Sequence, residues 1–250
     1  MTPADWDPGA LIRFLAAFCR EHPLDEKTLV VPAFIVGRQI GEALARRAGS
    51  WVNLRFVTPS TLAAEVLERS GGAGESRPLS SSSELALTDR LVRALVAEGK
   101  LGYLGRAGAS PGLVHALYRA VRDLRLDGRT SADIRPERFL VADKGRELAL
   151  LLERYERALA DDGLSDRPAV LGRAAREFAE TAPRPAWTLA LRDVRLSRLE
   201  ADLVRAVGGG RLVLVPGDPV FGLERPRHFW PAEEVENGPG AGPLSWLFAP

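Results

Sequence analysis

The chain has 250 residues, of which 46% are hydrophobic and 27% charged, so it is neither a disordered nor a fibrous polypeptide. Its formal net charge of +1 excludes a bulk electrostatic attraction to nucleic acid or to a membrane. No apolar run is long enough to span a membrane, the N-terminus does not resemble a secretory signal, and a single cysteine, Cys19, excludes a disulfide scaffold. We therefore expect a cytoplasmic protein.

The first third of the chain alternates between helical and strand patterns. Apolar residues at helical spacing predict a helix over residues 8–20, and the valine-rich run Thr28–Pro32 predicts a buried strand. A helix over 35–47, a strand over 52–57 and a helix that begins at Thr58 follow. Strands that alternate with helices predict an α/β fold with a parallel sheet and crossover helices.

A helical block interrupts this pattern. Residues 70–83 are rich in glycine and serine and are predicted to form a flexible connection. From 84 to 182 we expect no strand. The expected helices are Glu84–Glu98, Pro111–Leu126, Lys144–Asp161 and Arg167–Glu180.

The α/β pattern returns in the last part of the chain, residues 183–250. Strands are predicted over Trp187–Val194 and Arg211–Val215, with a helix between them that Ser197 and Glu200 begin as a capping box. A tail rich in proline and glycine follows. The predicted organisation is an α/β domain that begins in 1–69, a connection over 70–83, an inserted helical subdomain over 84–182, and a return to the α/β domain. Because the sequence ends on an apolar cluster, we expect a longer protein.

Motifs for phosphate and metal chemistry are incomplete. The one Lys-Thr pair, Lys27-Thr28, precedes a strand, and glutamates stand where a P-loop needs glycines, so a solvated turn is the expected structure. Glu137 and Asp143-Lys144 lack the spacing of a PD-(D/E)XK nuclease, because the lysine must lie two residues after its acid to share a strand face with it. The three histidines lack zinc-ligand spacing.

One helix carries arginines that could contact phosphates. Arg119, Arg122 and Arg125 lie away from the apolar face of the helix predicted over 111–126. The alternative is a solvated face, with neighbouring aspartates as partners, in a chain where arginine supplies all but three of the 34 basic residues.

The order of segments resembles that of superfamily-one helicases and, in particular, of AddB-like subunits of ATP-dependent helicase–nucleases. The segments that carry the resemblance are Thr28–Leu44, Phe56–Ala63, Lys144–Leu159, Gly163–Asp166, Val194–Leu203 and Gly217–Pro219.

The resemblance implies a RecA-like sheet with an inserted helical subdomain and a role in repair and recombination of double-strand breaks. It further implies contact with single-stranded DNA or duplex ends and a helicase–nuclease partner of AddA type. Candidate DNA contacts are Arg38, Thr58 and Ser60, which lie near strand ends and helix starts. Relatives use ATP, Mg²⁺ and sometimes an iron–sulfur cluster, and they carry a RecB-family exonuclease domain, which would lie beyond Pro250.

The chain departs from an active helicase at each nucleotide motif. No Walker A element precedes the first strand, the candidate Walker B aspartate, Asp193, lacks a following glutamate, and the sensor glutamine after Asp218 is missing. The resemblance therefore implies that Asp193 and Asp218 are remnants of a nucleotide site and that this chain holds no cofactor. Two alternatives stay open: a protein-interaction scaffold without DNA contact, and a nucleotide-dependent enzyme with an unorthodox P-loop at Lys27.

Overall fold

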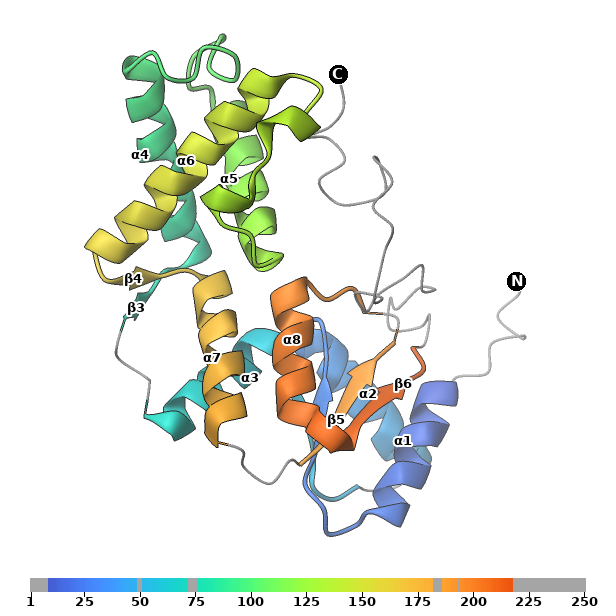
Figure 1. Cartoon of the computed structure of the whole chain (residues 1–250). Coiled ribbons are helices and arrows are strands. Elements are labelled where there is room, and N and C mark those ends of the chain that lie inside the picture. Colours follow the sequence, from blue (N-terminus) through green and yellow to red (C-terminus); the bar gives the residue numbers. More distant parts are fainter. Residues whose placement is uncertain (1–8, 49–50, 72–75, 182–185, 193, 218–250) are drawn as a thin grey trace, which may run out of the picture. The chain divides into compact units, whose positions relative to one another are not determined.

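A computed structural model of the chain describes residues 9–48, 51–71, 76–181, 186–192 and 194–217 (Figure 1). The described residues form two compact units. Residues 9–71 and 171–217 form the sheet unit, and residues 76–170 form the helical unit. The helix α7 (Arg167–Thr181) begins in the helical unit and continues in the sheet unit, whereas the sequence placed all of it in the helical block.

The sheet unit is built on four parallel strands in the order β2-β1-β5-β6. The strands are β1 (Lys27–Val30), β2 (Leu54–Val57), β5 (Trp187–Leu191) and β6 (Leu212–Val215). In register, Leu29 of β1 lies between Phe56 of β2 and Leu189 of β5. All four residues of β1 are buried, which is typical of a central strand covered on both faces. The predicted α/β class with a parallel sheet is confirmed.

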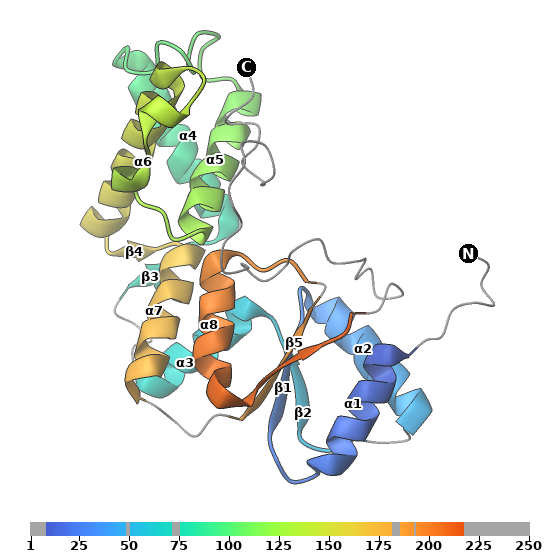
Figure 2. The same cartoon turned by 45° about the vertical axis from the view of Figure 1, so that its right-hand side comes forward.

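Helices cover both faces of this sheet (Figure 2). They are α1 (Ala10–Glu21), α2 (Phe34–Ala48), α3 (Pro59–Ser70) and α8 (Arg198–Gly208). On one face, α1 places Phe18 edge-on against Trp187, and α2 packs on Phe56. On the other face, Arg55 reaches Glu65 of α3, and α8 packs over Thr188. The capping box predicted at Ser197 and Glu200 begins α8 and is confirmed.

The amino end of β1 differs from its prediction. Lys27 is fully buried, and its amino group donates to the backbone carbonyl of His22 and, over 2.6 Å, to that of Asp25. The solvated turn expected at Lys27 is therefore wrong. An amphipathic lysine stem is stable inside a protein when its ammonium group meets acceptors, and the turn before β1 supplies two.

The helical unit packs three helices around a leucine-rich core. They are α4 (Ser81–Ala97), α5 (Pro111–Leu126) and α6 (Ala142–Asp161), with short 3₁₀ turns at Ser131–Asp133 and Pro136–Arg138. Two-residue strands, β3 (Arg77–Pro78) and β4 (Leu164–Ser165), pair in parallel.

Two expectations for this unit are wrong. Part of the connection predicted over 70–83 is regular, because β3 lies within it and Ser80 caps α4 by accepting a hydrogen bond from the backbone N–H of Ser83. A strand, β4, lies in the stretch where none was expected. Two residues are too few to produce a strand pattern in the sequence.

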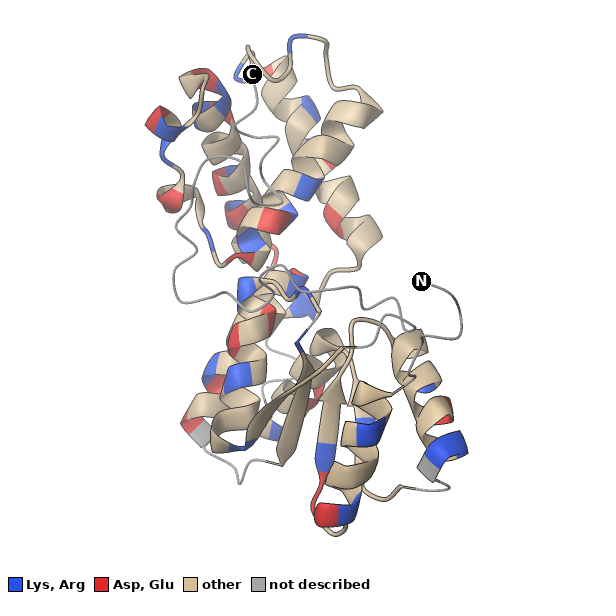
Figure 3. Ribbon diagram, turned by 90° about the vertical axis from the view of Figure 1, so that its right-hand side faces the viewer, with Lys and Arg blue, Asp and Glu red and all other residues tan. Residues whose placement is uncertain are grey.

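Both positively and negatively charged residues occur along the helices of each unit (Figure 3). Many are paired within one helix, as Arg93 is with Asp89 and Arg157 with Glu153. In the described ranges, no helix combines the length and the apolar composition that crossing a membrane requires.

Candidate functional site

The carboxyl edge of the four-stranded sheet contains a topological switch point. From β1 the chain passes through α2 on one face to β2, and from β5 it passes through α8 on the opposite face to β6. The two crossovers run in opposite directions across the sheet, so equal handedness places their helices on opposite faces. The loops after β1 and β5 therefore diverge at adjacent central strands. Open α/β sheets bind ligands in the crevice that such loops leave.

The loop after β1 presents exposed apolar side chains at this edge. Phe34 is 74% exposed and Ile35 is 48% exposed, although both belong to the first turn of α2. A large apolar side chain at the surface costs free energy unless something covers it. The next turn of α2 presents Arg38, which lies 3.6 Å from Glu42 with both side chains mostly exposed. Such an exposed pair is weak, so the Arg38 guanidinium stays available to an anion.

The loop after β5 adds two arginines that the sequence analysis missed. Arg192 and Arg195 are exposed, and neither side chain has a hydrogen bond or ion pair with the part of the chain that the structure describes. The predicted strand extended to Val194 and so placed Arg192 inside it. In the structure β5 ends at Leu191. The sequence could have indicated both arginines through their position after a predicted parallel strand, because the residues that follow such strands line this edge. The candidate Asp193 lies outside the described residues, as does Asp218.

The start of α3 contains the next two predicted contacts. The Thr58 hydroxyl accepts a hydrogen bond from the backbone N–H of Thr61 and lies 2.9 Å from the Thr61 hydroxyl, so it is occupied as a helix cap. Ser60 is exposed, and its hydroxyl has no partner among the described residues. Of the two, Ser60 is the one free to contact a ligand.

The predicted arginines of α5 belong to the helical unit and do not form one stripe. Arg119 is exposed and Arg122 is half-buried. Arg125 is only 15% exposed, and its guanidinium donates to both carboxylate oxygens of Asp166 and to Glu156. Arg125 is therefore an internal ion-pair residue, and we remove it from the candidate contacts.

The surroundings of Arg125 favour its charged form. Burial alone lowers the pKa of its guanidinium, but the hydrogen bonds and negative charge of Asp166 and Glu156 outweigh burial and raise that pKa. The Tyr155 ring lies 5.9 Å from the guanidinium carbon. Burial, followed by the charge of Asp166, raises the pKa of the Tyr155 hydroxyl far above its ordinary value. This cluster joins α5, α6 and the start of α7, so its role is structural.

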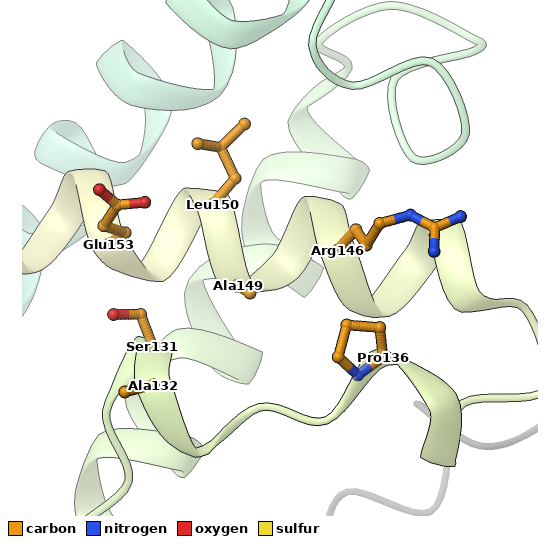
Figure 4. A pocket seen from close by; sticks show the side chains of 7 residues that line it. All are labelled: Ser131, Ala132, Pro136, Arg146, Ala149, Leu150 and Glu153. Carbon is orange, nitrogen blue, oxygen red and sulfur yellow. The ribbon is translucent and has the colours of Figure 1, made fainter.

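A cavity of about 390 Å³ lies between α6 and the turns at 131–138 (Figure 4). Its polar lining groups already have partners: Arg146 pairs with Asp143 over 2.5 Å, and the Ser131 hydroxyl donates to Glu156 over 2.7 Å. None of the predicted site residues lines it. The cavity therefore adds no candidate chemistry.

The described ranges contain no group of three or more His, Cys, Asp or Glu side chains that could hold a metal ion. Two basic residues lie near the position of a P-loop. Lys27 is at the amino end of β1, whereas Arg38 is near the start of α2, at the carboxyl edge of the sheet. The geometry supports binding of an anionic ligand at that edge.

The chain was compared with protein-family models and with curated proteins. No protein-family model matches the chain, and no curated protein matches it.

Proposed function

We propose that the chain is a non-hydrolysing, helicase-like module that holds DNA at the carboxyl edge of its sheet and docks a motor subunit. The observation that carries this proposal is the switch point between β1 and β5, because the segments that follow these two strands carry three exposed arginines, Arg38, Arg192 and Arg195, and exposed apolar side chains. Ligands of open α/β sheets bind at this position.

The residue types at this edge suit a nucleic acid better than a small organic anion. Exposed arginines attract backbone phosphates without reading the sequence of bases. The exposed ring of Phe34 offers a face on which an unpaired base can stack, and Ser60 offers a hydroxyl to a phosphate oxygen. Such a site would prefer single-stranded DNA or the frayed end of a duplex.

The layout of the chain supports the helicase-like part of the proposal. The helical unit is inserted between β2 and β5 of the parallel sheet, which is the order expected for a RecA-like domain with an inserted helical subdomain. We propose no hydrolysis, because the one lysine near a P-loop position, Lys27, is buried and donates to backbone carbonyls. Docking of an AddA-type motor partner rests on the family resemblance alone.

The test is binding of a fluorescent single-stranded oligonucleotide, followed by anisotropy at several salt concentrations. We expect weak binding that declines steeply between about 50 and about 200 mM salt. Replacing Arg38, Arg192 and Arg195 together by alanine should reduce the slope of log K against log salt by about 2, because each single-strand phosphate contact contributes about 0.7.

A charge-matched control removes three exposed arginines of the helical unit, Arg90, Arg93 and Arg157, and should leave binding within twofold of the unchanged protein. An Arg119→Ala, Arg122→Ala variant tests the rival surface on α5. Binding that is absent at low salt, or that depends on α5 and not on the sheet edge, would overturn the proposal. ATP hydrolysis, measured with and without DNA, should be undetectable.

A further inference from the structure

A long loop of the helical unit connects α4 to α5 (Figure 1). It comprises residues 98–110 and contains no helix or strand of its own. Connections between packed helices ordinarily have about 2–8 residues, and markedly longer ones without secondary structure are usually functional or disordered. The contacts that this loop makes with the rest of its unit distinguish between these two cases.

The helical unit holds the loop in one conformation. The carboxylate of Glu147 on α6 accepts hydrogen bonds from two successive backbone N–H groups, those of Tyr103 and Leu104, each over 2.8 Å. The side chain of Leu101 is buried in the leucine-rich core, and Leu104 packs against the same core. The backbone N–H of Gly105 donates to the carbonyl of Leu101 over 2.9 Å. The loop is therefore ordered, and a rigid scaffold fixes the positions of its outward side chains.

The outward side chains combine an aromatic ring with positive charge. Tyr103 is 36% exposed, and the exposed basic residues Lys100 and Arg106 lie three positions before and after it. Neither the Tyr103 hydroxyl nor the Arg106 guanidinium has a hydrogen bond or ion pair with the part of the chain that the structure describes. Lys100 lies 2.9 Å from Glu98, but that pair is exposed to solvent and therefore weak. The ring and both cations thus remain available to a ligand.

We propose that this loop is a second nucleic-acid contact, at which the Tyr103 ring stacks on an unpaired base while Arg106 and Lys100 attract the neighbouring phosphates. Aromatic side chains combined with basic ones bind single strands in this way, and stacking tolerates every base. The contact therefore adds affinity without sequence preference. This inference takes its class of ligand from the proposed function, but its residues belong to the other unit.

The exposed surface of the helical unit favours a nucleic acid over a protein partner. A protein interface is built around a well-packed apolar centre of several residues. Among the described residues of the helical unit, the exposed large apolar side chains are Tyr103 and Leu140 only. Gly102, which precedes Tyr103, is exposed and adds no side chain beside the ring. One open ring between two cations suits a base and its phosphates, whereas it is too small for the centre of a protein interface.

The first test measures the binding of a fluorescent single-stranded oligonucleotide to the full chain by anisotropy. Tyr103→Ala should raise the dissociation constant at least about fivefold, which is the loss expected for one stacked base. Tyr103→Phe keeps the ring and should bind within about twofold of the unchanged protein. Both variants retain the backbone N–H that donates to Glu147, so the loop keeps its anchor. Leu140→Ala, at a side chain that is 66% exposed, is the matched control and should leave binding unchanged.

The second test separates the charge of the loop from its ring. Arg106→Ala should reduce the slope of log K against log salt by about 0.7, the contribution of one single-strand phosphate contact. Arg138→Ala is the matched control and should leave the slope unchanged. Arg138 is likewise exposed, lies in a turn of the same unit and has no partner among the described residues.

The third test locates the contact directly by photochemical cross-linking. An oligonucleotide that carries 5-iodouracil couples under ultraviolet light to an aromatic side chain stacked on that base. Mass spectrometry of the digested complex should find the oligonucleotide on the peptide that contains Tyr103, and Tyr103→Ala should abolish this product.

Three results would overturn the inference: Tyr103→Ala that binds as the unchanged protein does, Tyr103→Phe that loses as much affinity as Tyr103→Ala, or cross-links only outside residues 98–110. The variant without Arg38, Arg192 and Arg195 keeps this outcome separate from that of the proposed function. Weaker binding in that variant, with none lost in Tyr103→Ala, removes the loop and leaves the sheet edge as the site. Weaker binding in Tyr103→Ala alone removes the sheet edge and leaves the loop.

Discussion

Thr28 and Thr188 are directly paired across β1 and β5, yet only one of the two hydroxyl groups is satisfied within the described residues. The Thr28 hydroxyl accepts a hydrogen bond from Nε of Arg55 over 3.1 Å. The Thr188 hydroxyl is fully buried and has no partner among the described residues. Gly208 of α8 packs against this side chain, since a Cβ at Gly208 would lie 3.3 Å from Cβ of Thr188.

This difference predicts opposite effects for one substitution at two paired sites. Thr188→Val replaces an unpaired buried hydroxyl by a methyl group of the same shape and should raise the free energy of unfolding by about 1 kcal/mol. Thr28→Val leaves the Arg55 Nε–H without its acceptor and should lower the free energy of unfolding by about 1 kcal/mol. Urea denaturation of both variants measures the two values. A Thr188→Val protein less stable than the unchanged one would show that its hydroxyl has a partner.

The Arg125–Asp166 pair predicts a large loss of stability on removal of one partner. Asp166 is 2% exposed, accepts from Arg125 and caps α7 by accepting from the backbone N–H of Ala169 over 3.0 Å. Arg125→Met should cost about 3 kcal/mol, because the buried carboxylate then lacks its counter-charge. Arg119→Met on the same helix should change stability by less than about 0.5 kcal/mol, because Arg119 is exposed. Equal effects of the two variants in thermal unfolding would contradict the internal role of Arg125.

The close packing of α2 on β2 predicts that adding a single methyl group at Gly37 lowers the stability of the protein. A Cβ at Gly37 would lie 2.8 Å from Cβ of Phe56 on β2, closer than two carbon atoms can approach without a shift of the helix. Gly37→Ala should therefore destabilise the protein by about 1–3 kcal/mol and should weaken oligonucleotide binding, because it displaces the turn that presents Arg38. Gly112→Ala in α5 meets nothing within 4 Å and should be neutral or stabilising by up to about 1 kcal/mol. Chemical denaturation of the two variants compares them directly.

The lowered pKa values of Asp25 and Asp133 predict how the stability of the folded protein depends on pH. The side-chain hydrogen bond from Trp187 lowers the pKa of Asp25, and the backbone N–H of Thr130 lowers the pKa of Asp133. A carboxyl group with a lowered pKa in the folded protein stabilises it above the pKa of the unfolded chain, ordinarily 3.8, and loses that contribution as pH falls through the folded value.

The melting temperature should therefore fall below about pH 4, and Asp133→Asn should make that fall shallower. Both carboxylates are close to solvent, so the individual contributions are small and decline in high salt. A melting temperature that is constant from pH 5 to pH 2.5, or an Asp133→Asn variant with an unchanged acid profile, would contradict this assignment.

Local signals in the sequence determined much of the fold. The proline at the start of α3, the capping box at Ser197 and Glu200, and apolar residues at helical or strand spacing are readable because they act over one or two turns of chain. The ends of elements were less accurate, and the extension of β5 to Val194 concealed Arg192 as a site residue. Of the candidate site, Arg38 and Ser60 were predicted from the resemblance together with their positions near a strand end and a helix start.

Only the tertiary structure decided the roles that depend on residues far apart in the sequence. Arg119 and Arg125 look alike in the sequence of α5, but Asp166, 41 residues beyond Arg125, makes one internal and leaves the other exposed. In the same way, the order β2-β1-β5-β6 creates the switch point between β1 and β5. The physical reason is that helix caps and periodicity are local interactions, whereas strand order and ion-pair burial depend on contacts that form only when distant segments fold together.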